Sequence, residues 1–132
     1  MPERAVVDAS ALVDLLADPR PGAAVAARLL NRDLHAPAHL DSEVLSGLGR
    51  LHRAGALSAE QVRARLVELA AAPITRHDLA PLLVGAWQRR HRLRLADAFY
   101  VELAESLGMT LVTADARLAS AAPGVEVVGR AT

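Results

Sequence analysis

Apolar residues follow two alternating patterns along this chain. Short apolar runs, too brief for helices and partly β-branched, are typical of buried strands. Longer segments carry an apolar residue every three or four positions, as expected for helices with one buried face. The short runs predict five strands, over residues 5–7, 34–37, 73–75, 109–113 and 125–128.

The longer segments predict seven helices. They span about 10–16, 23–30, 41–54, 58–69, 79–90, 96–107 and 115–121. Proline and glycine within residues 18–22 indicate a turn between the first two helices. The side chains expected to face the core from the helices over 23–30 and 79–90 are Val25, Leu29, Leu30, Leu82, Leu83, Ala86 and Trp87.

Strands that alternate with helices predict a parallel sheet covered by helices on both faces. We therefore predict an α/β fold with a short central sheet, in a single domain over residues 1–132. A chain of 132 residues with 52% hydrophobic residues is large enough to bury a core. No repeat or low-complexity linker divides it.

The composition excludes several classes of function. No apolar run approaches 18 residues, so we expect no membrane span, and the first four residues do not resemble a signal peptide. The chain has no cysteine, which excludes disulfides and thiolate metal sites and makes a reducing cytoplasm the expected location. A net charge of zero argues against indiscriminate polyanion binding. All fifteen basic residues are arginine, which excludes mechanisms that need lysine.

Four acidic residues lie where predicted strands end or predicted helices begin. Asp8 and Asp115 each follow a strand, and would reach the carboxyl edge of the sheet, where ligands bind in such folds. Glu43 and Asp97 fall in the first turns of helices. Each acid has a structural alternative, because aspartate caps helices and acids in a first turn complement the helix dipole.

Four carboxylates brought together would repel one another unless cations neutralised them. Two divalent cations would balance the four charges, as in two-metal phosphodiesterase sites. Because only oxygen ligands are offered, the expected ions are hard ones, Mg²⁺ or Mn²⁺. Ser10 and Thr113 lie within two residues of these acids, so their hydroxyl groups would either orient the site or make ordinary turn hydrogen bonds.

Four segments of the chain carry a family resemblance. They are VDASAL over residues 7–12, the helix start around Glu43, LADAFYVELA over 95–104 and LVTADARL over 111–118. Together they resemble the signature segments of PIN-domain nucleases, in particular the VapC toxins of bacterial toxin–antitoxin pairs. The resemblance runs from end to end, since chain length and element order both fit.

The resemblance implies a specific chemistry. Asp8, Glu43, Asp97 and Asp115 match the family's catalytic and metal-binding acids, and Ser10 and Thr113 match neighbouring polar support. The implied activity is Mg²⁺- or Mn²⁺-dependent endonucleolytic cleavage of RNA, which would be tRNA, rRNA or mRNA. The implied partners are a VapB-like antitoxin that covers the site and a second copy of the chain. Many members have a further acid after the last one, where this chain has Arg117.

Positive charge is concentrated just before Asp97, in the run RRHRLR over residues 89–94. Arg92 and Arg94 are therefore candidates to bind RNA phosphates, and Arg50 and Arg117 are further candidates. The structural alternative is a solvated helix end, where cations complement the dipole. The histidines show no ligand spacing, and we expect no metal role for them. Tyr100 follows Asp97 closely enough to lie near the site.

Other functions remain alternatives at this stage. A receiver-like signalling domain also places acids at strand ends. Proteins that it would resemble need a lysine, however, and this chain has none. A catalytically inactive PIN-like module that binds metal or a partner is a second alternative. A DNA nuclease is a third, because no residue pattern identifies a reader of the 2′-hydroxyl group.

Overall fold

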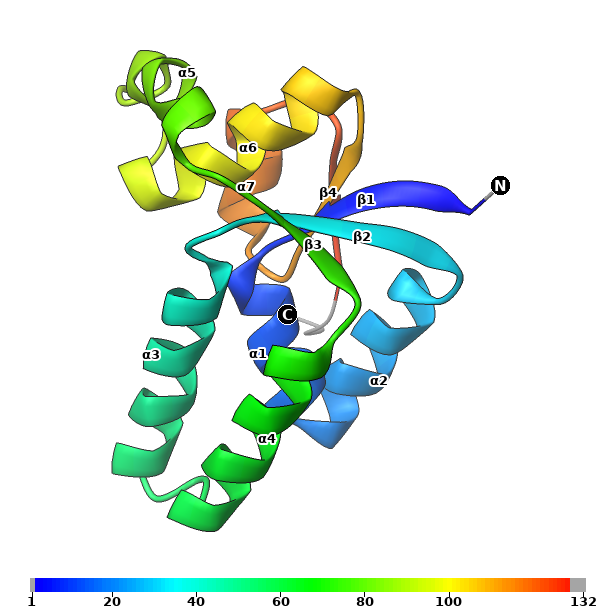
Figure 1. Cartoon of the computed structure of the whole chain (residues 1–132), viewed down its shortest axis with the longest axis vertical. Helices are drawn as coiled ribbons and strands as arrows, with labels where there is room; N and C mark the ends of the chain where they lie inside the picture. Colours follow the sequence, from blue (N-terminus) through cyan, green and yellow to red (C-terminus); the bar gives the residue numbers. More distant parts are fainter. Residues whose placement is uncertain (1, 129–132) are drawn as a thin grey trace.

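The computed structural model describes residues 2–128 (Figure 1). The strands are β1 Glu3–Val7, β2 Arg32–Pro37, β3 Ile74–His77, β4 Thr110–Thr113 and β5 Val125–Val127. The helices are α1 Ala9–Ala17, α2 Pro19–Leu29, α3 Leu40–Arg53, α4 Ala59–Ala71, α5 Leu83–Gln88, α6 Leu95–Leu107 and α7 Ala116–Ala121. A 3-10 turn, η1 Ala80–Leu82, precedes α5.

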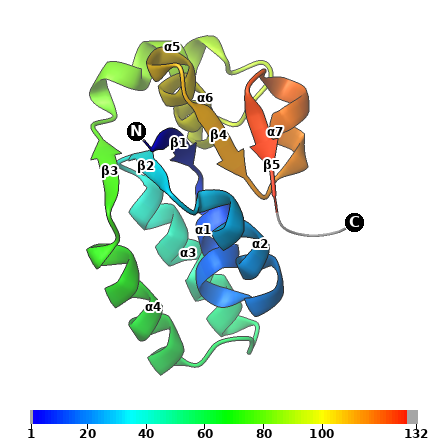
Figure 2. The same ribbon diagram turned by 90° about the vertical axis from the view of Figure 1, so that its right-hand side faces the viewer.

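The strands form one parallel sheet in the order β3-β2-β1-β4-β5, with β1 at its centre. Helices α1 to α4 lie on one side of the sheet, and α5 and α6 lie on the other (Figures 1 and 2). Helix α7 packs beside the edge strand β5. The predicted α/β fold with helices on both faces is confirmed. Within residues 2–128, no helix is long and apolar enough to cross a membrane.

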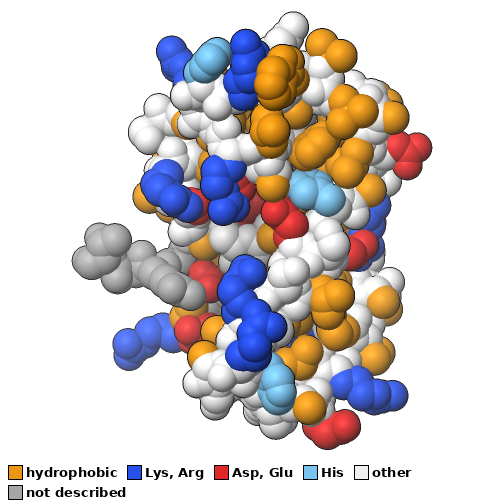
Figure 3. Space-filling model, turned by 90° about the vertical axis from the view of Figure 1, so that its left-hand side faces the viewer, with side chains coloured by type: hydrophobic (Ala, Val, Ile, Leu, Met, Phe, Trp, Pro, Cys, Tyr) orange, Lys and Arg blue, Asp and Glu red, His pale blue; other side chains and the backbone are white. Residues whose placement is uncertain are grey.

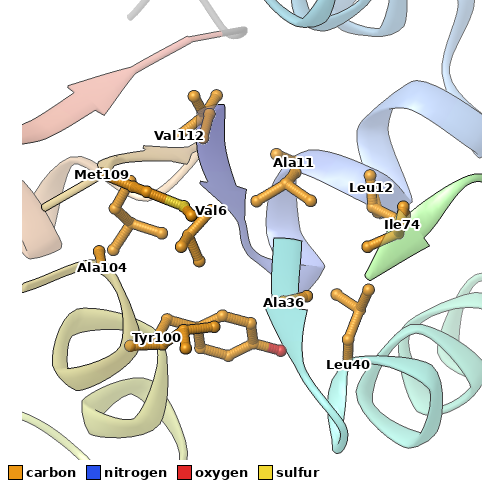
Figure 4. Packing of buried hydrophobic residues seen from close by; sticks show 14 of the residues in the cluster. Val6, Ala11, Leu12, Ala36, Leu40, Ile74, Tyr100, Ala104, Met109 and Val112 are labelled. Atoms are coloured by element: carbon orange, nitrogen blue, oxygen red, sulfur yellow. The ribbon is translucent and has the colours of Figure 1, made fainter. Parts of the chain in front are cut away.

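The core lies on both faces of the central strands. Ala5, Val6 and Val7 of β1 are fully buried, as expected for a strand covered on both sides. Tyr100 and Met109 pack near Val6, whereas Ala11, Leu12, Leu40 and Ile74 lie toward the other helices (Figure 4). The strand predicted from the three-residue apolar run is thus confirmed.

The predicted turn over residues 18–22 is wrong, because α2 already begins at Pro19. The side chain of Asp18 caps the helix by accepting a hydrogen bond from the Arg20 amide. Proline is well suited to the first helical position, since its missing N–H would have no partner there. Leu30 lies beyond the helix end and is 71% exposed, so its predicted burial is also wrong.

Gly22 allows α2 to pack closely on α1. A Cβ atom at this position would lie 2.7 Å from the Asp14 carbonyl oxygen, which is backbone and cannot turn aside. We expect Gly22→Ala to lower the free energy of unfolding by about 1–3 kcal/mol. The control is Gly49→Ala in α3, where a Cβ meets nothing within 4 Å and should stabilise the helix by up to about 1 kcal/mol. Urea denaturation measures both, and equal effects would contradict this account.

The predicted helix over 79–90 is divided into η1 and α5. Leu82 and Ala86 are buried as predicted, but Leu83 and Trp87 are more than half exposed. The reason is that α5 packs on α6 through the face that carries Gly85, whose backbone lies against the Glu102 carboxylate. The opposite face of α5 is therefore apolar and solvent-exposed.

Candidate active site

A cavity of about 870 Å³ opens at the carboxyl edge of β1 and β4, between α1, α3, α6 and α7. All four predicted acids, Asp8, Glu43, Asp97 and Asp115, line it. Figure 3 shows acidic side chains near the middle of one face of the molecule, with arginines on either side. The other predicted residues that line the cavity are Ser10, Tyr100, Arg50, Arg94 and Arg117. Arg92 is exposed and is not among the lining residues.

Asp8 is both a helix cap and a site residue. It follows β1, and its Oδ1 accepts hydrogen bonds from the Ala11 amide at 3.0 Å and the Ser10 hydroxyl at 2.8 Å. Its Oδ2 accepts from the Thr113 hydroxyl. All three donors are uncharged, and the side chain is 4% exposed. Burial therefore dominates and raises the pKa of Asp8 from 3.8 to about 6, with a further contribution from the charge of Asp97.

Ser10 and Thr113 join the two turns that carry aspartates at the sheet edge. Ser10 Oγ accepts a hydrogen bond from the Ala114 amide and lies 3.2 Å from Thr113 Oγ1. Thr113 Oγ1 accepts from the Asp115 amide at 3.0 Å while donating to Asp8. The two hydroxyl groups thus connect the β1–α1 turn with the β4–α7 turn. Thr113 is fully buried beneath the cavity.

Glu43 reaches the cavity from the first turn of α3. The Tyr100 hydroxyl donates to its Oε1 at 2.6 Å, and His39 Nε2 lies 3.4 Å from the same atom. Burial, followed by Glu43, raises the pKa of Tyr100 far above its ordinary value, so the phenol is a donor. Histidine spacing gave no reason to place His39 here. The one available signal was its position four residues before Glu43 at a helix start.

Asp97 and Asp115 each have an arginine partner. Arg94 Nε lies 3.2 Å from Asp97 Oδ2, and the Arg117 guanidinium donates to both oxygens of Asp115. These hydrogen bonds are the largest cause of the lowered pKa of Asp115. Arg94 and Arg117 are 73% and 80% exposed, so such pairs contribute little to stability and exchange readily.

A divalent cation fits the donor set of this cavity. In the part of the chain that the structure describes, no three Asp, Glu or His side chains are gathered into a ready-made ligand cluster. Arg94 and Arg117 instead compensate two of the four carboxylates. Asp8, however, is buried with neutral donors alone and has a raised pKa, so its charge lacks a cationic partner. Carboxylate oxygens that line one cavity are the ligands that Mg²⁺ and Mn²⁺ prefer.

Comparison with known proteins identifies the family of the chain. Residues 5–123 match the family model described as "PIN domain". The chain is 57% identical over 129 residues to Ribonuclease VapC3 of Mycobacterium tuberculosis, covering 97% of this chain and 94% of that protein.

Two solved structures share the fold. VapC20 of Mycobacterium tuberculosis, described as a sarcin-ricin loop cleaving toxin, superposes with a TM-score of 0.69 at 18% identity, covering 94% of this chain and 98% of that one. A toxin–antitoxin complex from Klebsiella pneumoniae gives a TM-score of 0.67 at 19% identity, covering 93% and 96%. The family match over residues 5–123 and the 57% identity place this chain in the PIN-domain family, among its VapC proteins.

Proposed function

We propose that this protein is a metal-dependent endoribonuclease toxin that hydrolyses RNA phosphodiester bonds and is neutralised by a cognate VapB-like antitoxin. The observation that carries the proposal is the convergence of Asp8, Glu43, Asp97 and Asp115 on one cavity. The 57% identity to a protein named as a ribonuclease supports the reaction. The curated relatives' names also favour RNA over DNA as the substrate.

In this mechanism Asp8, Glu43, Asp97 and Asp115 would hold Mg²⁺ or Mn²⁺ through carboxylate oxygens. The bound ion would supply the acidity that ionises an attacking water and would neutralise charge on the phosphate. The chain itself contributes position: Ser10, the Ala11 amide and Thr113 fix the Asp8 carboxylate from three directions. No side-chain nucleophile is needed, in accord with a chain that has neither cysteine nor lysine.

The arginines around the cavity would bind the RNA backbone. Arg50, Arg94 and Arg117 line the cavity, and the weak pairing of Arg94 and Arg117 with acids leaves both free to move onto phosphates. Arg92 lies on the connection just before α6 and is proposed as a more peripheral phosphate contact.

We expect Arg50→Gln to weaken RNA binding and to reduce the slope of log affinity against log salt by about 0.7–0.9 for each phosphate that Arg50 neutralises. Binding is measured at several salt concentrations in the Asp8→Asn background, so that the RNA is not cleaved. Arg63→Gln, an exposed substitution on α4 away from the cavity lining, is the control. An unchanged slope in Arg50→Gln would show that Arg50 is a surface residue that does not neutralise an RNA phosphate.

The proposed partners are an antitoxin and a second copy of the chain. The toxin–antitoxin complex among the structural neighbours supports an antitoxin partner, which we propose covers the cavity. The exposed apolar face of α5, with Leu83, Val84 and Trp87, supports an apolar protein interface such as that of a homodimer. We propose the cytoplasm as the site of action, since tRNA, rRNA and mRNA are found there.

Cleavage of a total RNA pool tests the proposed function. Purified protein, free of antitoxin, is incubated with Mg²⁺, Mn²⁺ or EDTA, beside the Asp8→Asn variant. Discrete fragments that require both the cation and Asp8 are the expected result, and their ends identify the RNA and the cleaved bond. Absence of cleavage in all conditions, with Mg²⁺ still raising the melting temperature, would favour a PIN-like metal-binding module without catalysis.

A further inference from the structure

Two side chains from different elements converge on one oxygen of Glu43. Tyr100, on α6, donates to Oε1 at 2.6 Å, and His39, just before α3, places Nε2 at 3.4 Å from the same atom. Within residues 2–128, no hydrogen bond reaches Oε2. One oxygen of Glu43 is thus held, and the other remains available.

The proton position on His39 follows from its neighbours. Nε2 lies 2.9 Å from the Ala96 carbonyl oxygen and 3.4 Å from Glu43 Oε1. Both atoms are acceptors, so Nε2 carries the hydrogen. Nδ1 is buried, and no hydrogen-bond partner is found for it among the described residues, as this tautomer allows. His39 therefore donates to the Ala96 carbonyl, directly before Asp97, and lies beside Glu43 without a hydrogen bond to it.

Packing fixes the rings of Tyr100 and His39 in place. Tyr100 is only 1% exposed, and its ring lies in the core with the hydroxyl directed toward the connection between β2 and α3 (Figure 4). The His39 ring packs against Tyr100 and Phe99, with centroid distances of 4.8 and 4.9 Å. A donor that is immobilised by the core restricts the rotamers of the carboxylate it binds.

We propose that Tyr100 is a positioning residue for Glu43, which holds Oε1 so that Oε2 is presented to a divalent cation in the cavity, and that the His39 ring supports Tyr100 by packing against it. The inference rests on the proposed function in assigning Glu43 to the cation. Partners of this kind orient a ligand before the ion binds, and their loss typically weakens metal affinity about 10- to 100-fold. Tyr100 contributes most because its contact is short and buried.

Titration of the full chain with Mn²⁺ alone, by calorimetry, tests the proposal without RNA. Tyr100→Phe keeps the ring in the core and removes only the hydroxyl, so we expect it to fold and to bind Mn²⁺ at least about tenfold more weakly. His39→Leu should weaken binding less, because His39 donates to the Ala96 carbonyl and supports Tyr100 through ring packing alone. The matched control is Ser42→Ala, which removes a hydroxyl bound to the His39 carbonyl beside Glu43 and should leave Mn²⁺ affinity unchanged.

A double-mutant cycle separates positioning from simple packing. In a Glu43→Gln background, Tyr100→Phe should cause no further loss of Mn²⁺ affinity, since it acts through the Glu43 carboxylate. Unchanged affinity in Tyr100→Phe, or an equal loss in both backgrounds, would overturn the proposal. Failure of the wild type to bind Mn²⁺ would overturn both the proposal and the metal site. Mn²⁺ binding without RNA cleavage would contradict the proposed function alone.

Discussion

Asp8→Asn is expected to abolish RNA cleavage and, at the same time, to raise the stability of the metal-free protein. Cleavage should fall by several orders of magnitude, because a neutral amide replaces the most deeply buried of the four carboxylates. Stability should rise because the native protein holds that charge among neutral donors. The pKa of Asp8, about 6 against an ordinary 3.8, corresponds to about 3 kcal/mol at neutral pH, which is an upper limit to the gain.

The local network accommodates an asparagine. Its carbonyl oxygen takes the place of Oδ1 and still accepts from Ser10 and the Ala11 amide. The amide group faces Thr113, whose hydroxyl then donates to Ser10 Oγ, 3.2 Å away. The buried Thr113 hydroxyl thus keeps an acceptor after the charge of Asp8 is removed.

The stability difference between Asp8→Asn and the wild type should change with pH in a defined direction. The folded protein binds a proton at Asp8 more tightly than the unfolded chain, so this contribution to stability is fully present below pH 3.8 and is lost as the pH rises to about 6. The advantage of Asp8→Asn should therefore grow between pH 4 and 6 and then level off. Denaturant unfolding across this range measures it, with the exposed Asp78→Asn as control. A pH-independent difference would show that Asp8 is not the group responsible.

Thr113→Val is expected to have the opposite effect on stability. Valine matches threonine in shape, but it leaves the Asp115 amide without its acceptor and Asp8 without a donor. A buried group left unpaired in this way costs about 1–3 kcal/mol. Loss of the Thr113 hydrogen bond, which lowers the pKa of Asp8, should also enlarge the penalty above pH 6, where Asp8 must ionise. Cleavage should weaken because Asp8 loses one of three fixed contacts.

The two substitutions can be combined. In the Asp8→Asn background, the loss in free energy of unfolding caused by Thr113→Val should no longer depend on pH. Only the smaller cost of the unpaired Asp115 amide should remain. Unfolding at pH 5 and pH 7.5 separates the two parts. If Thr113→Val in an otherwise wild-type chain lowers the free energy of unfolding equally at both pH values, Thr113 stabilises the turn independently of the charge of Asp8. The matched control is Thr75→Val, at an exposed position on β3.

The sequence predicted the parts of the site that depend on local order. Asp8 and Asp115 were recognisable because an apolar run, an acid and a helix start follow one another within a few residues, and parallel strands bring such ends to one edge. The exposed face of α5 was not predictable in the same way. Its periodicity is that of a buried helix, and only the packing of Gly85 against α6 decides which side is covered.

The environment of Glu43 could not have been predicted from spacing. Tyr100 is 57 residues away in sequence, and His39 had no ligand pattern to mark it. Both contacts depend on how α6 and α3 meet across β1 and β2. The spacing of apolar residues along the chain does not predict this packing. The same holds for the arginines, since Arg94 lines the cavity and Arg92, two residues earlier, does not.

The central place of β1 in the sheet also determines when the proposed active site can form during synthesis of the chain. Asp8 precedes Thr113 by 105 residues, although β1 and β4 are neighbours in the sheet. A growing chain that already contains β1 but not β4 therefore lacks Thr113, Asp115 and the strand that supports them. On the function proposed, we therefore expect no RNA cleavage before β4 emerges and inserts beside β1, and none by products truncated before β4.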